Sequence, residues 1–168
     1  MPLSFLPGLM TQKTTDVTPE LLRSSGITLL MLDFDNTIVP YTTTVPTVEM
    51  ETWLQDMNSL EDIQLCIVSN SRNDRVPKFC RERGIDVITH AKKPFPKGIR
   101  ECLAKYDIPA SKAALIGDQI FTDTLGANNA GVLPILVEAI DNHNFWLKAR
   151  HVLELPFIFF ARNRRITK

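Results

Sequence analysis

The sequence has few cysteines and no spacing of them that suits a zinc site. Only Cys66, Cys80 and Cys102 occur among its 168 residues. Cysteine-based zinc sites use closely spaced pairs such as CxxC, and a disulfide framework needs an even number of cysteines. We therefore expect buried, reduced thiols, as in a cytosolic protein.

Long apolar runs and an excess of charge of one sign are also absent. No uninterrupted apolar stretch approaches about 20 residues, the length that spans a bilayer as a helix. Lys plus Arg and Asp plus Glu number 19 each, so the composition gives no signal for binding a polyanion such as nucleic acid. The first residues lack a basic region followed by an apolar core, and we expect no signal peptide.

What is present suits one globular domain. Hydrophobic residues make up 44% of the chain and charged residues 23%, enough for a single buried core. The charge is uneven, because residues 141–168 hold six Lys or Arg and two Asp or Glu. We expect one domain over residues 1–168, with its core at about 18–140 and a basic, aromatic-rich C-terminal segment at 141–168.

Apolar runs alternate with amphipathic stretches along the chain. We predict buried parallel strands at 27–32, 63–68, 86–89, 113–116 and 133–137. We predict helices at 18–26, from Thr44 or Val45, at 74–83, at 96–106 and from the residue after Gln119 to Ala130. The second helix is predicted to turn four residues toward the core: Val48, Trp53, Leu54 and Met57. Residues 1–16 are predicted to form a loose arm or a cover for the core.

This alternation predicts the fold class. Strands joined by helices form an α/β fold with a mainly parallel five-stranded sheet and right-handed crossovers. In such open sheets, ligands bind at the carboxyl ends of the strands. The residues that directly follow each predicted strand are therefore the first candidates for a functional site.

Two aspartates follow the first apolar strand. Asp33 and Asp35 are separated by Phe34 alone and are followed by Asn36 and Thr37. Two carboxylates at a strand end repel each other, so a divalent cation between them is one explanation. The other is an Asx-type turn, in which Asp and Asn accept backbone hydrogen bonds. Taken alone, this segment leaves both explanations open.

Polar residues occupy similar places further along the chain. Ser69 follows the second strand, Lys93 precedes the fourth helix, and Asp118 follows the fourth strand. Each has an ordinary structural explanation, as a turn residue, a surface lysine and a helix N-cap respectively. Their occurrence together and in this order favours a single site at one edge of the sheet.

In that order, these segments resemble the motifs of the haloacid dehalogenase (HAD) superfamily of phosphotransferases. DFDNT at 33–37 matches DxDx[TV], Ser69 the second motif, Lys93-Pro94 the third, and Gly117-Asp118 through Asp123 the GDxxxxD motif. The resemblance implies a Rossmannoid three-layer α/β/α sandwich. It also implies a Mg2+-dependent phosphomonoester hydrolase that works through an aspartyl-phosphate.

The resemblance implies a role for each acidic residue. Asp33 would be the nucleophile, and Asp35 would protonate the leaving oxygen and later take a proton from water. Mg2+ would be held by Asp33, the backbone carbonyl of Asp35 and Asp118. Asp123 would also serve the metal, either directly or through water. An acid at position 35 is what phosphatases of this superfamily keep and its ion pumps and dehalogenases lack.

The resemblance also implies which residues hold the substrate. Lys93 and the Ser69 hydroxyl would bind the oxygens of the phosphoryl group in transfer. Thr37 and Asn70 are candidates for further substrate contacts, although Asn70 also suits a purely structural loop role.

The motifs are too close together for a large cap domain. Asp35 and Ser69 are 34 residues apart, and Ser69 and Lys93 are 24 apart, so each interval holds roughly one helix and one strand. The compact chain and its C-terminal segment resemble the YqeG-type branch of subfamily IIIA, which is related to the mitochondrial phosphatidylglycerophosphate phosphatases. This implies that the chain converts phosphatidylglycerophosphate to phosphatidylglycerol.

The C-terminal segment mixes aromatic and aliphatic residues with Lys and Arg, a pattern that suits a membrane interface. A last helix packed on the sheet, with a solvated basic end, is the alternative. We expect a cytoplasmic protein with a phosphorylated substrate, no nucleic-acid partner, and peripheral contact at the inner face of the membrane.

Two other functions remain open at this point. A capless HAD phosphatase could act on a soluble phosphometabolite or a nucleic-acid end instead. An alternative of another class is a non-catalytic, receiver-like interaction module switched by aspartyl phosphorylation. The sequence argues against that module, because its acidic pair would lie apart from the phospho-acceptor, whereas Asp33 and Asp35 share one strand end.

Overall fold

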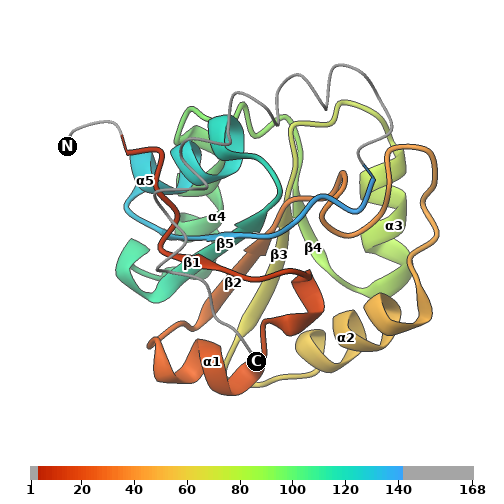
Figure 1. Ribbon diagram of the computed structural model, residues 1–168, viewed down its shortest axis with the longest axis horizontal. Coiled ribbons are helices and arrows are strands. Elements are labelled where there is room, and N and C mark those ends of the chain that lie inside the picture. The colour runs from red at the N-terminus through yellow and green to blue at the C-terminus, as the bar shows by residue number, and fades with distance from the viewer. Residues whose placement is uncertain (1–3, 142–168) are drawn as a thin grey trace.

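The computed structural model describes residues 4–141, which fold around one parallel sheet (Figure 1). The strand order is β1-β6-β5-β2-β3-β4, and every pairing is parallel. The strands are β1 Leu9–Met10, β2 Leu29–Leu32, β3 Gln64–Val68, β4 Asp86–Ile88, β5 Ala113–Gly117 and β6 Leu133–Leu136. The basic C-terminal segment discussed above lies outside the described residues, apart from Asp141.

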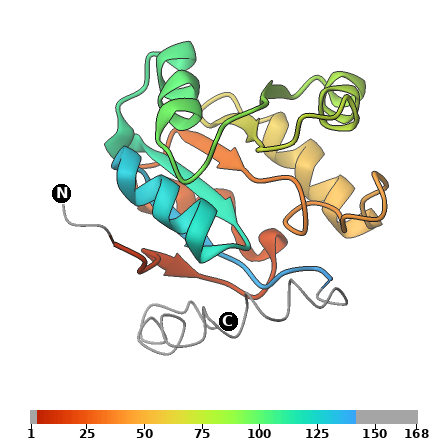
Figure 2. The same cartoon turned by 90° about the horizontal axis from the view of Figure 1, so that it is seen from above.

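Helices cover both faces of the sheet (Figure 2). They are α1 Pro19–Ser24, α2 Val48–Asn58, α3 Arg75–Arg83, α4 Lys97–Tyr106 and α5 Leu125–Ala130. Successive residues of β2 face opposite layers: Leu30 belongs to a core cluster with Trp53 of α2, and Leu29 to one with Ile99 of α4. The predicted α/β/α sandwich is therefore confirmed, with β2 and β5 at its centre.

The sheet has one strand more than predicted. Leu9 and Met10 form β1, which pairs with β6 in the register Leu9 to Ile135 and Met10 to Leu136. Residues 1–16 are thus not simply a loose arm or a cover. A strand of two residues is too short to produce a recognisable apolar alternation, and it forms because β6 offers a free edge for hydrogen bonding.

Helix α2 begins later than predicted, and one of its assigned core residues is wrong. The N-cap is Thr47, whose hydroxyl accepts a hydrogen bond from the Met50 amide at 3.2 Å. Trp53, Leu54 and Met57 are buried as predicted. Val48, in contrast, lies in the first turn on the solvent side and is 85% exposed.

The three cysteines are free and buried, as the sequence predicted. Cys66 of β3 and Cys102 of α4 share one core cluster, and Cys80 of α3 belongs to the other. Burial raises the pKa of Cys80 to about 12. The thiol form is therefore favoured, and this cysteine acts as a small apolar side chain.

No cap domain interrupts the core. The chain between Asp35 and Ser69 contains α2 and β3, and the chain between Ser69 and Lys93 contains α3 and β4. Within residues 4–141, no helix combines the length and the apolar character needed to cross a bilayer. Within the described residues, the carboxyl edge of the sheet is therefore bordered by loops and not by a cap domain.

Candidate active site

The predicted residues meet at the carboxyl edge of the central strands. Asp33 directly follows β2, Ser69 follows β3, and Asp118 follows β5, and these three strands are neighbours in the sheet. A small pocket of about 130 Å³ opens at this edge. The predicted residues that line it are Asp33, Asp35, Ser69, Asn70, Lys93 and Asp123.

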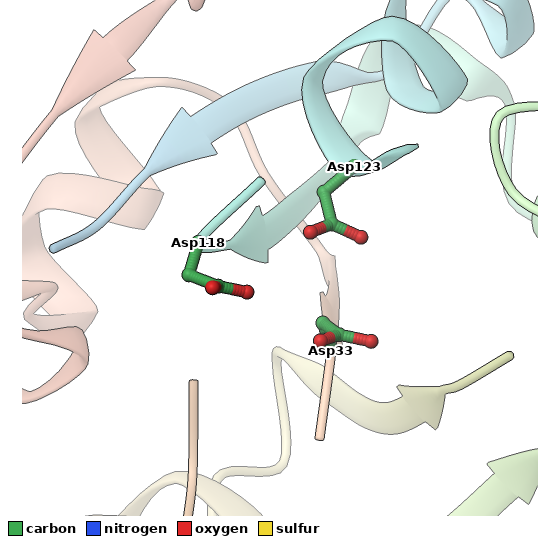
Figure 3. Close-up of side chains that lie close together, drawn as sticks. All are labelled: Asp33, Asp118 and Asp123. Atoms are coloured by element: carbon green, nitrogen blue, oxygen red, sulfur yellow. The ribbon is translucent and has the colours of Figure 1, made fainter. Parts of the chain in front are cut away.

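Three buried carboxylates form the most acidic part of the site (Figure 3). Asp33, Asp118 and Asp123 each offer an oxygen, and these oxygens lie within 4.8 Å of one another. Buried, hard oxygen ligands at this spacing fit a divalent cation such as Mg2+ or Ca2+. Burial raises the pKa of Asp33 from 3.8 to about 6, although the neighbouring Lys93 ammonium opposes this effect.

Lys93 supplies a positive charge inside this acidic cluster. Its ammonium lies 2.6 Å from Asp33 Oδ1 and 2.7 Å from Asp123 Oδ1, and its side chain is only 1% exposed. Burial alone would lower the pKa of Lys93, but the carboxylates of Asp123 and Asp33 outweigh burial and raise it. Lys93 therefore remains charged at neutral pH and aligns the Asp33 carboxylate.

Asn70 holds the backbone of Lys93. Its side-chain oxygen accepts a hydrogen bond from the Lys93 amide at 2.7 Å, and its Nδ2 donates to the Lys93 carbonyl at 2.9 Å. The two bonds use both ends of the amide, so the loop role considered for Asn70 is the one that the geometry supports. This contact fixes the base of the Lys93 side chain relative to β3.

The Ser69 hydroxyl is oriented by a local turn. Ser69 is buried, and its Oγ accepts a hydrogen bond from the Ser71 amide at 3.1 Å. An oxygen that accepts from the backbone keeps its own proton free for donation. That donor lies in the wall of the pocket, where an anionic oxygen can be bound.

Arg75, the first residue of α3, is a part of the site that the sequence analysis missed. Its Nη2 is in direct contact with Asp35 Oδ1, and its Nη1 donates to the Tyr41 carbonyl at 2.9 Å. The guanidinium also lies 5.2 Å from the centre of the Phe34 ring. Arg75 thus joins the second aspartate to the loop before α2, a contact that no strand-end pattern indicates.

Thr37 is the one predicted residue that does not join the others. It does not line the pocket beside Asp33 but borders a second, larger pocket. Its carbonyl accepts a hydrogen bond from the Thr14 hydroxyl at 2.8 Å, which ties the turn after Asp35 to the N-terminal arm. The residues that line the pocket beside Asp33 without having been predicted are Tyr41, Ser71, Gln119 and Thr122.

Similar solved structures share this fold. A HAD-superfamily hydrolase from Ehrlichia chaffeensis matches with a TM-score of 0.53 and 18% identity, over 77% of this chain and 98% of that one. A Legionella pneumophila protein described as a subfamily III A HAD hydrolase matches with a TM-score of 0.54 and 16% identity, over 86% of this chain and 88% of that one. Fold, motifs and site together define a capless phosphatase of the HAD superfamily.

Sequence comparison gives the family. The chain belongs to the family described as "Mitochondrial PGP phosphatase", whose model matches residues 1–140. It is also similar to the protein called "Probable phosphatase YqeG" from Bacillus subtilis. The two are 32% identical over 133 residues, which cover 79% of this chain and 77% of that protein.

Proposed function

We propose that this phosphatase removes the terminal phosphate of phosphatidylglycerophosphate, giving phosphatidylglycerol, with Mg2+ as its metal. The observation that carries the chemistry is the buried cluster of three aspartates with Lys93 among them. The proposed lipid substrate is supported by the family match over residues 1–140. The capless edge of the sheet leaves room for a bulky substrate to present only its phosphate end.

The carboxylates of Asp33 and Asp118 would hold the metal, together with the Asp35 carbonyl, and Asp123 would contribute directly or through water. Bound there, Mg2+ would neutralise the negative charge of the phosphate. This chain's own residues would orient the same group. Lys93 and the Ser69 hydroxyl would bind its oxygens, since both line the pocket next to Asp33.

The proposed reaction has two displacements at phosphorus. In the first, an Asp33 carboxylate oxygen bonds to phosphorus, the bond to the leaving oxygen breaks, and Asp35 gives that oxygen a proton. In the second, Asp35 takes a proton from water as the water oxygen bonds to phosphorus, which frees phosphate and restores Asp33. With a pKa of about 6, Asp33 is mostly ionised at neutral pH and ready to attack.

The first test is a phosphate-release screen with the purified protein and Mg2+. Phosphatidylglycerophosphate is compared with sugar phosphates, nucleotides and phosphorylated DNA ends. We expect the highest kcat/KM for the lipid, loss of activity with a chelator, and recovery when Mg2+ is returned. A soluble phosphate or a DNA end turned over faster would reject the lipid assignment and leave the phosphatase intact.

Asp33→Asn tests the nucleophile. The amide keeps the shape of the side chain but cannot form an acyl-phosphate, so phosphate release should stop while the fold is kept. Turnover by this variant at the wild-type rate would disprove the role. A wild-type protein that takes up one phosphate and never releases it would instead be the receiver-like module.

A further inference from the structure

A second pocket lies beside the catalytic one, and its walls are mostly apolar. Its volume is about 570 Å³, within the range of roughly 300–1,000 Å³ typical of small-molecule sites. It is enclosed by the N-terminal arm, the loop before α2, the first turn of α2 and the segment after β6. Its apolar lining residues are Ile38, Pro40, Val45, Met50, Ala139 and Ile140.

Exposed apolar side chains gather around this pocket. Within residues 4–141, the large hydrophobic residues left exposed are Tyr41, Val45, Val48, Ile140 and Phe95. Of these, Val45 and Ile140 line the apolar pocket, Tyr41 lines the catalytic pocket, and Val48 lies between Thr47 and Glu49, which both line the apolar pocket. A cluster of exposed apolar groups around a concave surface is typical of an interaction site.

The segment after β6 is held against the loop that follows Asp35. The Ile140 amide donates to the Asn36 carbonyl at 3.0 Å, and Asn36 Nδ2 donates to the Asp141 carbonyl at 2.9 Å. These bonds bring the wall formed by residues 138–140 beside the loop that carries Val45 (Figure 1). The apolar pocket is therefore built on the same turn that carries the catalytic aspartates.

Two consecutive residues of the chain line the two pockets. Pro40 lines the apolar pocket, and the next residue, Tyr41, lines the catalytic pocket. The catalytic pocket, at about 130 Å³, has room for little more than a phosphate group. The remainder of a larger substrate must therefore lie outside it, and the apolar pocket begins on the other side of the Pro40–Tyr41 segment.

We propose that the apolar pocket and its exposed rim bind the acyl chains of a lipid phosphomonoester whose phosphate occupies the catalytic pocket. This rests on the proposed function, which supplies the lipid class of the substrate. The pocket would take the chains out of water, and the exposed Val45 and Val48 would contact the part of the same chains that the pocket leaves uncovered. Under this assignment, residues 40–48 are the part of the protein that selects an acylated substrate.

The test replaces the two exposed valines together, Val45→Gln and Val48→Gln. These side chains are 73% and 85% exposed, so the substitutions leave the core intact. Phe95→Gln is the matched control, because Phe95 is also exposed, at 69%, but lies outside the apolar pocket. Circular dichroism and thermal unfolding establish that all three proteins are folded alike.

Kinetics on two forms of one substrate separate the binding of the acyl chains from the reaction at the phosphate. The first is short-chain phosphatidylglycerophosphate below its micelle concentration, and the second is its deacylated headgroup. The double variant should raise KM for the acylated form about tenfold, as expected when two valine side chains lose a partial contact with lipid chains worth about 1.4 kcal/mol in total. Its KM for the headgroup and its kcat on both forms should equal those of the Phe95→Gln control.

Two kinetic outcomes would overturn the proposal. In one, KM for the acylated form is unchanged by the double variant. In the other, KM rises equally for both forms, which would place the effect in the catalytic pocket. A third outcome concerns self-association. If the wild-type protein forms dimers, the double variant does not, and the kinetics on lipid are the same for both, this surface binds a second copy of the chain.

Failure of the proposed function is distinguishable from failure of the pocket. If soluble monoesters are hydrolysed and neither form of phosphatidylglycerophosphate is, the substrate assignment is wrong. The pocket is then tested by calorimetric titration with short-chain phosphatidylglycerol. Weaker binding to the double variant than to the control would uphold the pocket, and equal or absent binding to all proteins would reject it.

Discussion

Single residues set the charge balance of the site. Lys93 lies between Asp33 and Asp123, so one positive charge faces two carboxylates in a buried pocket. Charges of one sign held together without water are costly unless they are compensated. A metal ion bound by Asp33, Asp118 and Asp123 would complete that compensation.

The pKa of Asp33 predicts how stability depends on pH. Burial raises this pKa from 3.8 to about 6. Between these values, the folded metal-free protein keeps a proton that the unfolded chain has released. Raising the pH from about 4 to about 6 should therefore lower the free energy of unfolding by about 2 kcal/mol.

Urea unfolding of the metal-free protein across this pH range measures the effect. Asp33→Asn is the comparison, since its amide does not titrate. The difference between wild type and variant should change with pH in the stated direction. Parallel curves for the two proteins would show that Asp33 ionises in the folded state as readily as in water.

Asn70 is predicted to act on catalysis through Lys93. Asn70→Ala removes both bonds to the Lys93 backbone and lets the ammonium move from its place beside Asp33. We expect kcat to fall about 10–100-fold, the effect of a misplacement of roughly 1 Å. Asn73→Ala is the control, because Asn73 is exposed in the same loop.

The Asn70 variants also distinguish an effect on the position of Lys93 from an effect on the stability of the fold. Asn70→Asp retains the acceptor that receives the Lys93 amide and loses the donor to the Lys93 carbonyl, so it should keep an intermediate kcat. If kcat of Asn70→Ala matched that of the control while its unfolding free energy fell by about 1–3 kcal/mol, the role of Asn70 would be structural only.

At the scale of elements, the turn after β5 places the third carboxylate. Residues 120–124 form a π-helical turn between β5 and α5, and the Gln119 amide donates to Asp123 Oδ2 at 3.1 Å. The pattern of small residues in the sequence predicted one continuous helix here. Such wider turns often occur at functional sites, and this one turns Asp123 back toward β5.

Gly117 is predicted to be essential for this turn. A Cβ at this position would lie 2.4 Å from Asp123 Cβ and Cγ, so close that either Asp123 or the backbone at position 117 would have to shift. Gly117→Ala should displace Asp123, abolish metal-dependent phosphate release and cost about 1–3 kcal/mol of stability. Gly126→Ala is the control, since its nearest contacts are at 3.4 Å and alanine favours the α5 helix.

Activity and calorimetric Mg2+ titration of both glycine variants provide the measurements. Gly117→Ala should bind Mg2+ more weakly than Gly126→Ala. Equal affinity and activity in the two variants would mean that Asp123 is dispensable for the metal, leaving Asp33 and Asp118 as its carboxylate ligands.

At the scale of the whole molecule, the catalytic pocket, the apolar pocket and the start of the C-terminal segment lie close together. Asp141, next to the apolar pocket, is followed by the basic, aromatic-rich stretch seen in the sequence. Exposed apolar side chains and a basic segment are the two features by which peripheral proteins bind anionic bilayers, and this chain has the first in its structure and the second in its sequence.

Deletion of residues 145–168 tests the contribution of that segment. We expect a larger loss of activity on phosphatidylglycerophosphate in anionic vesicles than on a soluble phosphate ester. Added salt should reduce the wild-type rate on vesicles toward that of the truncated protein, because the attraction is electrostatic. Equal losses on both substrates, or a truncated protein that does not fold, would count against a membrane role.

The sequence by itself determined which strands form the core and which residues follow them at the site. Apolar runs marked β2, β3, β5 and β6 because buried parallel strands are apolar on both faces. Asp33, Ser69 and Asp118 could be assigned to one edge because each follows such a strand. These are local patterns, and they need no knowledge of which distant segments meet.

Only the tertiary structure decided what depends on distant contacts. It paired β1 with β6, placed Arg75 on Asp35, bound Asn70 to the Lys93 backbone and moved Thr37 to the apolar pocket. Each of these contacts joins segments far apart in the chain, or depends on the path of a loop. Such contacts have no period or spacing in the sequence, because packing alone brings the partners together.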